Sequence, residues 1–402
     1  MRTSNAIIAV SSFAIIATAE SQLQVVSWAG AGCLWLVWRA RRTRWDVLSA
    51  TLAVYAAMTI VSCGVSQYTR DALIPTGYFL VCLGWEYSAA RAMANRSQIR
   101  AALWGGAIGF AVLAVRGLLW PVSAASEFGG VFGQENAVGS VCAAGVVTTL
   151  AAQYLTSVDD GNGFSGRRAF QGIFAMMLVC LSGVGLALSG SRGATFAVLS
   201  YLVVLLFLSG VKGLLIMAAI GGCLAASISA GLGSDLERLS LPHRLNALYN
   251  EFAQTSHISD LLTFKEIGTR AELSLVGLEV FLENPIFGTG LGTFSAHHPA
   301  FSYTHSTIPE LLASGGAACT LPLAAAVAIV VLRASNMARA SEPYASWGRQ
   351  ALAIQAFLFV QGLSIPILAS RSHTILVAFL LSFAMLSVKR VQPLRSDRTN
   401  LP

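Results

Sequence analysis

Long apolar runs separated by short, basic connections are the feature that most constrains how this chain can fold. Each run can cross about 30 Å of hydrocarbon as a helix, the shorter ones with help from flanking residues. The sequence therefore predicts an all-α, polytopic integral membrane protein with about twelve transmembrane helices, forming a single domain over residues 1–402. The predicted spans are residues 5–19, 22–38, 46–64, 72–90, 101–120, 136–156, 169–189, 193–209, 213–231, 307–332, 350–369 and 372–388.

The amino-acid composition fits a membrane protein and argues against a soluble one. Hydrophobic residues make up 55% of the chain and charged residues only 11%, whereas a soluble domain carries about a quarter charged residues. The net charge of +7 is spread over short connections, so nucleic acid is not an expected partner. The seven cysteines lie within apolar runs without a CxxC spacing, so we expect neither a disulfide nor a metal role for them.

Lysine and arginine are concentrated in every second connection. Because basic loops stay in the cytoplasm, this alternation predicts cytoplasmic N- and C-termini in a bacterial cell inner membrane. Ala17-Thr18-Ala19 resembles a signal-peptidase site, but only Arg2 precedes the apolar run, so we expect the first helix to be retained. The cytoplasmic connections would carry Arg39, Arg41, Arg42, Arg44, Arg91, Arg96, Arg100, Arg167, Arg168, Lys212, Arg333, Arg339 and Arg349.

One connection is much longer than the others. Residues 232–304, between the ninth and tenth spans, form a large loop on the predicted periplasmic side. The pattern predicts helices at 242–254 and 271–283 within it. Three glutamates share one face of the second helix and the opposite side is apolar, so this helix should lie on the membrane surface or on the bundle.

Two arginines on the predicted outer side are not needed to orient the chain. Arg192 lies in a tight hairpin between two spans, where it could reach lipid head groups or bind a phosphate through its planar fork. Arg270 precedes the amphipathic helix, where an ion pair with Glu266 or Glu272 is the simpler interpretation. Sequence position leaves both alternatives open for Arg192, whereas for Arg270 position alone favours the ion pair.

His305 lies directly before a membrane helix. Thr307 and Glu310 have the spacing of a capping box, and Pro309 suits a first helical turn. A helix N-terminus and a nearby arginine both disfavour imidazolium, and a neutral imidazole is a competent general base. The alternative is a loop histidine without a role. The adjacent pair at 297–298 lacks a carboxylate or cysteine pattern, so no zinc site is expected.

A glycine-rich stretch, Gly288-Thr289-Gly290-Leu291-Gly292, follows the amphipathic helix. No strand precedes it, so it is not a dinucleotide-binding motif. It predicts a tight turn with positive φ angles, and a backbone nest facing a phosphate is the alternative. Asn136 opens another helix, where it would serve as a cap.

These pieces occur in the order found in the O-antigen ligase and O-antigen polymerase superfamily, which the chain resembles over residues 130–320. The segments that carry the likeness are Ser191-Arg192-Gly193-Ala194, the run from Gly268-Thr269-Arg270 through the glycine-rich stretch to Phe294, and His305 to Gly315, together with Asn136. Departures from the family pattern are Ser306, Leu273 and Ala318.

The resemblance implies a metal-independent glycosyltransferase without a cofactor. Its donor would be an undecaprenyl-diphosphate-linked glycan, and its acceptor a lipid A core or a growing polysaccharide. On this resemblance Arg192 and Arg270 hold the diphosphate and His305 acts as the general base. Asn136 and Glu310 are further candidates for substrate binding, and Arg371, at the last outer turn, is a third phosphate contact inferred from topology.

The sequence leaves the type of transfer open. A ligase, an O-antigen polymerase and an exopolysaccharide polymerase share the donor chemistry and differ only in the acceptor. A flippase for lipid-linked oligosaccharides is an alternative of another class, although transporters usually show paired repeats and midplane charges that are not evident here. A non-catalytic assembly factor is the third alternative.

Overall fold

The computed structural model describes residues 2–17, 32, 46–93, 95–119, 135–159, 166–189, 191–209, 265–298, 301, 303–365 and 373–391. Within these residues all regular secondary structure is helical and there is no strand, which confirms the predicted all-α class. The helices are α1 (Arg2–Ala17), α3 (Val47–Val65), α4 (Thr69–Ala92), α5 (Arg96–Leu119), α6 (Glu135–Asp159), α7 (Gly166–Ser189), α8 (Arg192–Ser209), α13 (Lys265–Glu283), α14 (Thr307–Ala338), α15 (Tyr344–Gly362) and α16 (Thr374–Val391), with a short 3-10 turn, η2 (Phe294–Ala296).

Among the described residues, six helices are long and apolar enough to cross a membrane, which makes this a multi-pass membrane protein. They are α3, α5, α6, α7, α8 and α14. The predicted spans 22–38 and 213–231, and the predicted helix at 242–254, lie outside the described residues. The total of twelve spans and the side on which the long loop lies therefore stay predictions.

Several predicted helix boundaries were wrong. The helix predicted at 101–120 begins at Arg96, and the helix predicted at 307–332 continues to Ala338. The helix predicted at 350–369 is α15, which begins at Tyr344 and ends at Gly362. Its polar first turns are helical because Glu342 accepts hydrogen bonds from the Ser346 amide at 3.1 Å and hydroxyl at 2.6 Å, and also binds Arg349. The helix predicted at 271–283 begins at Lys265, so Arg270 lies within α13 rather than before it.

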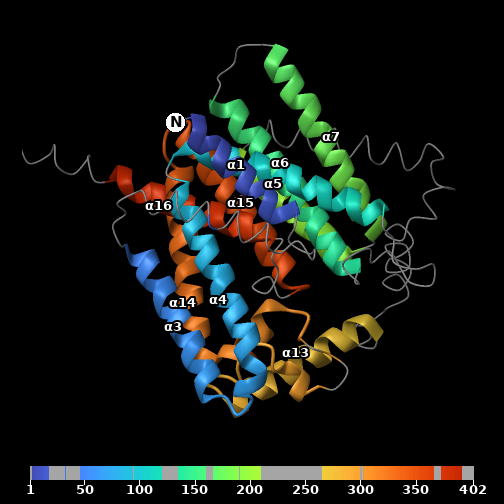
Figure 1. Cartoon of the computed structure of the whole chain (residues 1–402), viewed down its shortest axis with the longest axis vertical. Helices are drawn as coiled ribbons and strands as arrows, with labels where there is room; N and C mark the ends of the chain where they lie inside the picture. Colours follow the sequence, from blue (N-terminus) through green and yellow to red (C-terminus); the bar gives the residue numbers. More distant parts are fainter. Residues whose placement is uncertain are drawn as a thin grey trace, which may run out of the picture.

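The helices form two groups that pack against each other (Figure 1). One group contains α3, α4 and α14, and the other contains α1, α5, α6, α7, α8 and α15, while α16 packs against helices of both groups, mainly against α4 and α14. Contacts of α14 with α15 and of α4 with α16 join the groups. Helix α13 packs against α14 at one end of the bundle.

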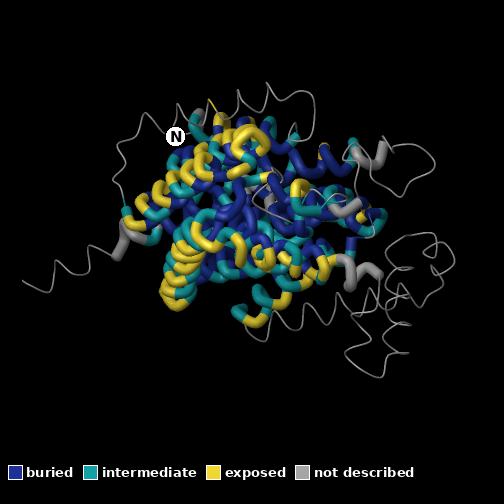
Figure 2. Tube along the Cα trace, turned by 90° about the horizontal axis from the view of Figure 1, so that it is seen from below, coloured by how far each residue is buried: buried dark blue, intermediate teal, exposed yellow. Residues whose placement is uncertain are grey.

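The core lies between the helices, and the apolar outer faces are exposed. Trp347, Phe357 and Phe379 are fully buried in the main hydrophobic cluster. By contrast, Phe207 is 85% exposed and Ile173 is 71% exposed, as expected for side chains that face lipid. Figure 2 shows this arrangement, with buried residues inside and exposed residues along the outer helix faces.

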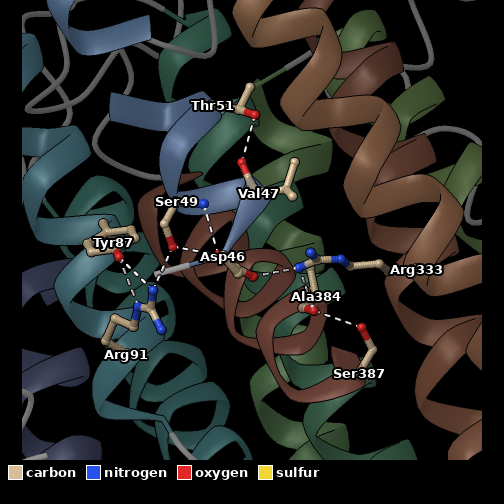
Figure 3. A network of polar contacts seen from close by, with 9 residues as sticks. All are labelled: Asp46, Val47, Ser49, Thr51, Tyr87, Arg91, Arg333, Ala384 and Ser387. Atoms are coloured by element: carbon tan, nitrogen blue, oxygen red, sulfur yellow. Dashed lines mark hydrogen bonds and ion pairs between the residues drawn. The ribbon is translucent and has the colours of Figure 1, made fainter. Parts of the chain in front are cut away.

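A polar network connects α3, α4, α14 and α16 (Figure 3). Asp46 caps α3 by accepting from the Ser49 amide at 2.9 Å, and it forms an ion pair with Arg333 of α14 at 3.0 Å. Arg333 also donates to the Ala384 carbonyl of α16 at 3.0 Å. Arg91 of α4 donates to the Ser49 hydroxyl at 2.6 Å. These contacts fix the mutual positions of α3, α4, α14 and α16.

Candidate functional site

His305 lies in a strained turn immediately before α14. Its φ angle is +59°, in the left-handed region that costs a residue with a Cβ atom about 1–3 kcal/mol. The backbone N–H of Thr304 donates to the Glu310 carboxylate at 2.9 Å, and the Thr304 hydroxyl donates to the Ser306 carbonyl at 2.8 Å. Ser314 donates to the other oxygen of the same carboxylate at 3.3 Å. Glu310 therefore holds the turn that presents His305.

The predicted capping box at Thr307 and Glu310 is wrong. The N-cap residue is Ser306, and its side chain makes no capping hydrogen bond. Glu310 instead reaches six residues back to Thr304, because the left-handed turn at His305 brings that amide over the helix start. Thr307 uses its hydroxyl to donate to the Ile365 carbonyl at 2.9 Å, beyond the last turn of α15.

Arg270 acts electrostatically on His305. Partial burial of the imidazole and the positive charge of Arg270 both lower the pKa of His305 below its usual value. Helix α13 is held close to the histidine turn at Gly277, where an added Cβ would lie 2.9 Å from the Thr304 side chain and 3.2 Å from Pro309. The structure thus brings two of the predicted residues, one from α13 and one from the turn before α14, into one electrostatic environment that favours the neutral imidazole.

Arg192 is linked to the same region through the end of α15. It is the first residue of α8, and the next residue, Gly193, is so close to Ser364 that an added Cβ would lie 2.4 Å from its hydroxyl oxygen. The following residue, Ile365, accepts the hydrogen bond from Thr307. One turn at the end of α15 therefore contacts both the start of α8 and the start of α14.

The start of α6 packs against the hairpin that precedes Arg192. An added Cβ at Gly139 would lie 2.3 Å from the Ser191 side chain and 2.7 Å from the Ser189 hydroxyl. Asn136 is the second residue of α6, so it lies in the first helical turn rather than at the predicted cap position. This packing places the first turns of α6 beside the α7–α8 hairpin. Arg371 lies outside the described residues.

The sequence interpretation missed a buried pair beside this hairpin. The hydroxyl of Ser140 lies 3.1 Å from Nε2 of His373, and both residues are buried. His373 directly precedes α16, and its ring lies 6.1 Å from that of Phe357. The available signal was a histidine at the edge of an apolar run, where a buried polar group needs a partner.

The glycine-rich stretch forms the predicted turn with positive φ angles. Gly288, Gly290 and Gly292 have φ values of +65°, +95° and +75°. The alternative of a phosphate-binding nest is wrong for the central amides, because Thr289 donates its N–H to the Ala313 carbonyl at 2.9 Å. Gly290 likewise donates to the next carbonyl of α14 at 2.8 Å.

These hydrogen bonds satisfy backbone groups that a break in α14 leaves without helical partners. Gly316 has φ +59° and ψ −163°, which interrupts the helix within an apolar run. The amides beyond the break are satisfied by the same loop, since Ala317 donates to the Pro285 carbonyl and Ala318 to the Ile286 carbonyl, both at 2.9 Å. Every backbone group that the break frees at these positions thus finds a partner, as a membrane environment requires. The glycine-rich loop and the N-terminal half of α14 form one unit.

Comparison with known proteins supports the family resemblance. The O-antigen ligase family model matches residues 176–318, a range that includes Arg192, Arg270, His305 and Glu310. Asn136 and Arg371 lie outside the matched range. A search of curated proteins finds no match to this chain. The resemblance predicted from the sequence is confirmed: from residue 176 to residue 318 the chain is similar to the O-antigen ligase family.

Proposed function

We propose that this chain is a membrane glycosyltransferase that transfers a glycan from undecaprenyl diphosphate to an acceptor hydroxyl at the outer face of the membrane. The observation that carries the proposal is that the charge of Arg270 lowers the pKa of His305, and that both residues lie in the region similar to O-antigen ligases. A neutral base beside a fixed positive charge is what such a transfer needs. The base must accept a proton while an anionic leaving group departs nearby.

In the proposed reaction, the imidazole of His305 removes the proton from the acceptor hydroxyl. The hydroxyl oxygen then forms a bond to the anomeric carbon of the donor sugar, and the bond from that carbon to the diphosphate oxygen breaks. Undecaprenyl diphosphate leaves with the electron pair, and the proton passes from His305 to water. Arg192 and Arg270 bind the diphosphate, and their planar forks match phosphate oxygens.

Glu310 acts in this proposal as a positioning residue rather than as a substrate contact. Its two carboxylate oxygens accept from Thr304 and Ser314, on either side of the histidine turn. Independence of a metal ion, the roles of Asn136 and Arg371, and the donor and acceptor identities remain predictions.

The type of transfer is tested by deleting the gene and analysing lipopolysaccharide on gels. Loss of all O-antigen with accumulation of lipid-linked polymer indicates a ligase, and a core with a single repeat indicates a polymerase. Unchanged lipopolysaccharide with lost exopolysaccharide indicates an exopolysaccharide polymerase.

The proposed site residues are tested by complementing the deletion with variants. His305→Ala should fail to complement because it lacks the proposed base. Arg192→Lys and Arg270→Lys should complement weakly or not at all, because an ammonium lacks the bidentate fork of a guanidinium. Arg339→Lys, at an exposed position after α14, is the matched control. Full activity of His305→Ala would overturn the proposal.

The alternative of a flippase gains one observation from the structure. Transporters often contain discontinuous membrane helices, and α14 is broken at Gly316. In transporters, however, the freed backbone groups line a binding cavity, whereas here they are hydrogen-bonded to the glycine-rich loop. Movement of a lipid-linked glycan by the purified protein in liposomes, without transfer to an acceptor, would favour the flippase.

The proposed reaction also requires the site to face away from the cytoplasm. Cytoplasmic termini and a periplasmic long loop follow from the distribution of basic residues and are tested by reporter fusions. An alkaline phosphatase fused within residues 232–264 should be active, and a fluorescent protein at the C-terminus should fluoresce. The reverse pattern would exclude an extracytoplasmic site.

A further inference from the structure

A row of ring side chains leads up to His305. The rings of Phe294 and His298 are stacked with centroids 6.3 Å apart, and the ring of Phe301 lies 5.2 Å from that of His298. The centroids of Phe301 and Tyr303 lie 5.6 Å and 4.4 Å from that of His305. The row comes from the segment between η2 and α14, which the sequence interpretation treated as part of a long loop.

The far end of this row is fixed to the protein core. Phe294 is only 2% exposed, and η2 contacts α14. The neighbouring His297 packs edge-on against Tyr68, in the turn before α4, with centroids 5.4 Å apart. In contrast, Phe301 and Tyr303, next to His305, are partly exposed. The row is therefore anchored at one end and accessible at the end that carries the proposed base.

The distances restrict where an acceptor sugar can lie. A hydroxyl that His305 deprotonates must come within about 3 Å of an imidazole nitrogen. Because the ring of Tyr303 is only 4.4 Å from the imidazole centroid, a sugar bound in this way lies beside Tyr303, Phe301 or both. The C–H faces of a pyranose carry a weak positive potential, which complements the negative face of an aromatic ring.

The aromatic row carries no formally charged side chain. The segment from Phe294 to His305 contains no Lys, Arg, Asp or Glu, whereas Arg270 acts on the histidine from α13. An anionic diphosphate is attracted to the arginine. No Lys, Arg, Asp or Glu of the segment from Phe294 to His305 would compensate the desolvation of a charged sugar.

We propose that Tyr303 and Phe301 form the binding surface for the acceptor sugar, and that this surface takes an uncharged hexopyranose. This inference rests on the proposed glycosyltransferase function and adds to it a class of acceptor. It assigns to the two aromatic residues the recognition of the acceptor alone, with no part in binding the lipid-linked donor.

The test uses the full chain in lipid nanodiscs, with a lipid-linked glycan donor and a lipid A core that ends in an uncharged hexose. Tyr303→Ala and Phe301→Ala should each raise the KM for the acceptor about three- to tenfold and leave the donor KM within about twofold. Tyr303→Phe, which keeps the ring, should restore acceptor binding, whereas Tyr303→Leu, which keeps much of the volume without the ring, should not. Phe359→Ala, on the exposed face of α15, is the matched control.

A second measurement is independent of turnover. Saturation-transfer NMR should show contact between aromatic protons of the unmodified protein and the terminal hexose of the core, and this signal should fall in Tyr303→Leu. A core whose terminal sugar carries a phosphate should bind more weakly. Acceptor KM values unchanged in both alanine variants, or equal binding of the two cores, would overturn the inference. If instead the unmodified protein transfers no glycan to any acceptor, the proposed function itself fails.

Discussion

The hydroxyl of Ser140 lies 3.1 Å from Nε2 of His373, and this contact joins the first turns of α6 to the start of α16. Ser140 is one turn beyond Asn136, and its neighbour Gly139 packs against Ser191. The start of α6 is therefore held from two sides: by the hairpin that carries Arg192 and by a buried histidine from the last helix.

Removing this hydroxyl should loosen the start of α6. We expect Ser140→Ala to lower the free energy of unfolding by about 1–3 kcal/mol, because a buried imidazole nitrogen loses a partner. Thermal unfolding in detergent measures the effect. Ser157→Ala, at an exposed position near the other end of α6, is the control. Equal melting temperatures for the two variants would contradict the prediction.

Activity should depend on the hydrogen-bond-accepting oxygen of Glu310 more than on its negative charge. Glu310→Ala removes the acceptor for the Thr304 amide, so the turn at His305 loses its support and kcat should fall strongly. Glu310→Gln keeps one carbonyl oxygen for that amide and should recover much of the activity. Glycan transfer by both variants in nanodiscs tests this. If the glutamine variant is as inactive as the alanine variant, the carboxylate has a direct chemical role instead.

The low pKa of His305 should be visible in the pH dependence of transfer. Since only the neutral imidazole acts as a base, activity should persist to a pH below about 6.5, the usual histidine value. Arg270→Gln removes a cause of the lowered pKa, so the acid limb of kcat/KM should move to higher pH. Arg270→Lys keeps the charge and should keep the limb in place. Identical limbs in the glutamine variant and the unmodified protein would show that Arg270 does not act on His305.

The break in α14 should tolerate no side chain at Gly316. An added Cβ would lie 2.5 Å from the Ile286 carbonyl, and the positive φ is unfavourable for alanine. We expect Gly316→Ala to destabilise the protein by more than about 1 kcal/mol. Gly183→Ala, in α7 with nothing within 4 Å of an added Cβ, is the matched control and should be neutral or stabilising. A melting temperature for Gly316→Ala equal to that of the control would contradict the observed geometry.

The sequence predicted the helical segments well where the hydrophobic pattern was uninterrupted. The predicted spans 46–64 and 193–209 correspond to α3 and α8, and no end differs by more than one residue. The prediction failed where polar contacts decide the boundary, as at α15, where Glu342 stabilises a first turn that hydropathy excludes. The break at Gly316 was missed because a glycine within an apolar run is compatible with an unbroken membrane helix.

The candidate site was only partly predictable for a related reason. Arg192, Arg270 and His305 could be proposed because their residue types suggest phosphate binding and proton transfer at recognisable positions in the chain. The left-handed turn at His305 could not be predicted, because it depends on the contact between Thr304 and Glu310. Phe301 and Tyr303 lie in a segment without periodicity, so nothing in the sequence indicated that their rings would line up beside the histidine.

Hydrogen bonds from the glycine-rich loop fix how the N-terminal half of α14 is rotated about the helix axis, independently of the half beyond the break. One added residue turns the following part of an α-helix by about 100°. Inserted beyond residue 318, it would rotate the half that leads to Arg333 and leave His305 facing the same direction, because the loop fixes the N-terminal half independently. The part of α14 beyond the break can therefore change in length while the turn that carries His305 stays in place.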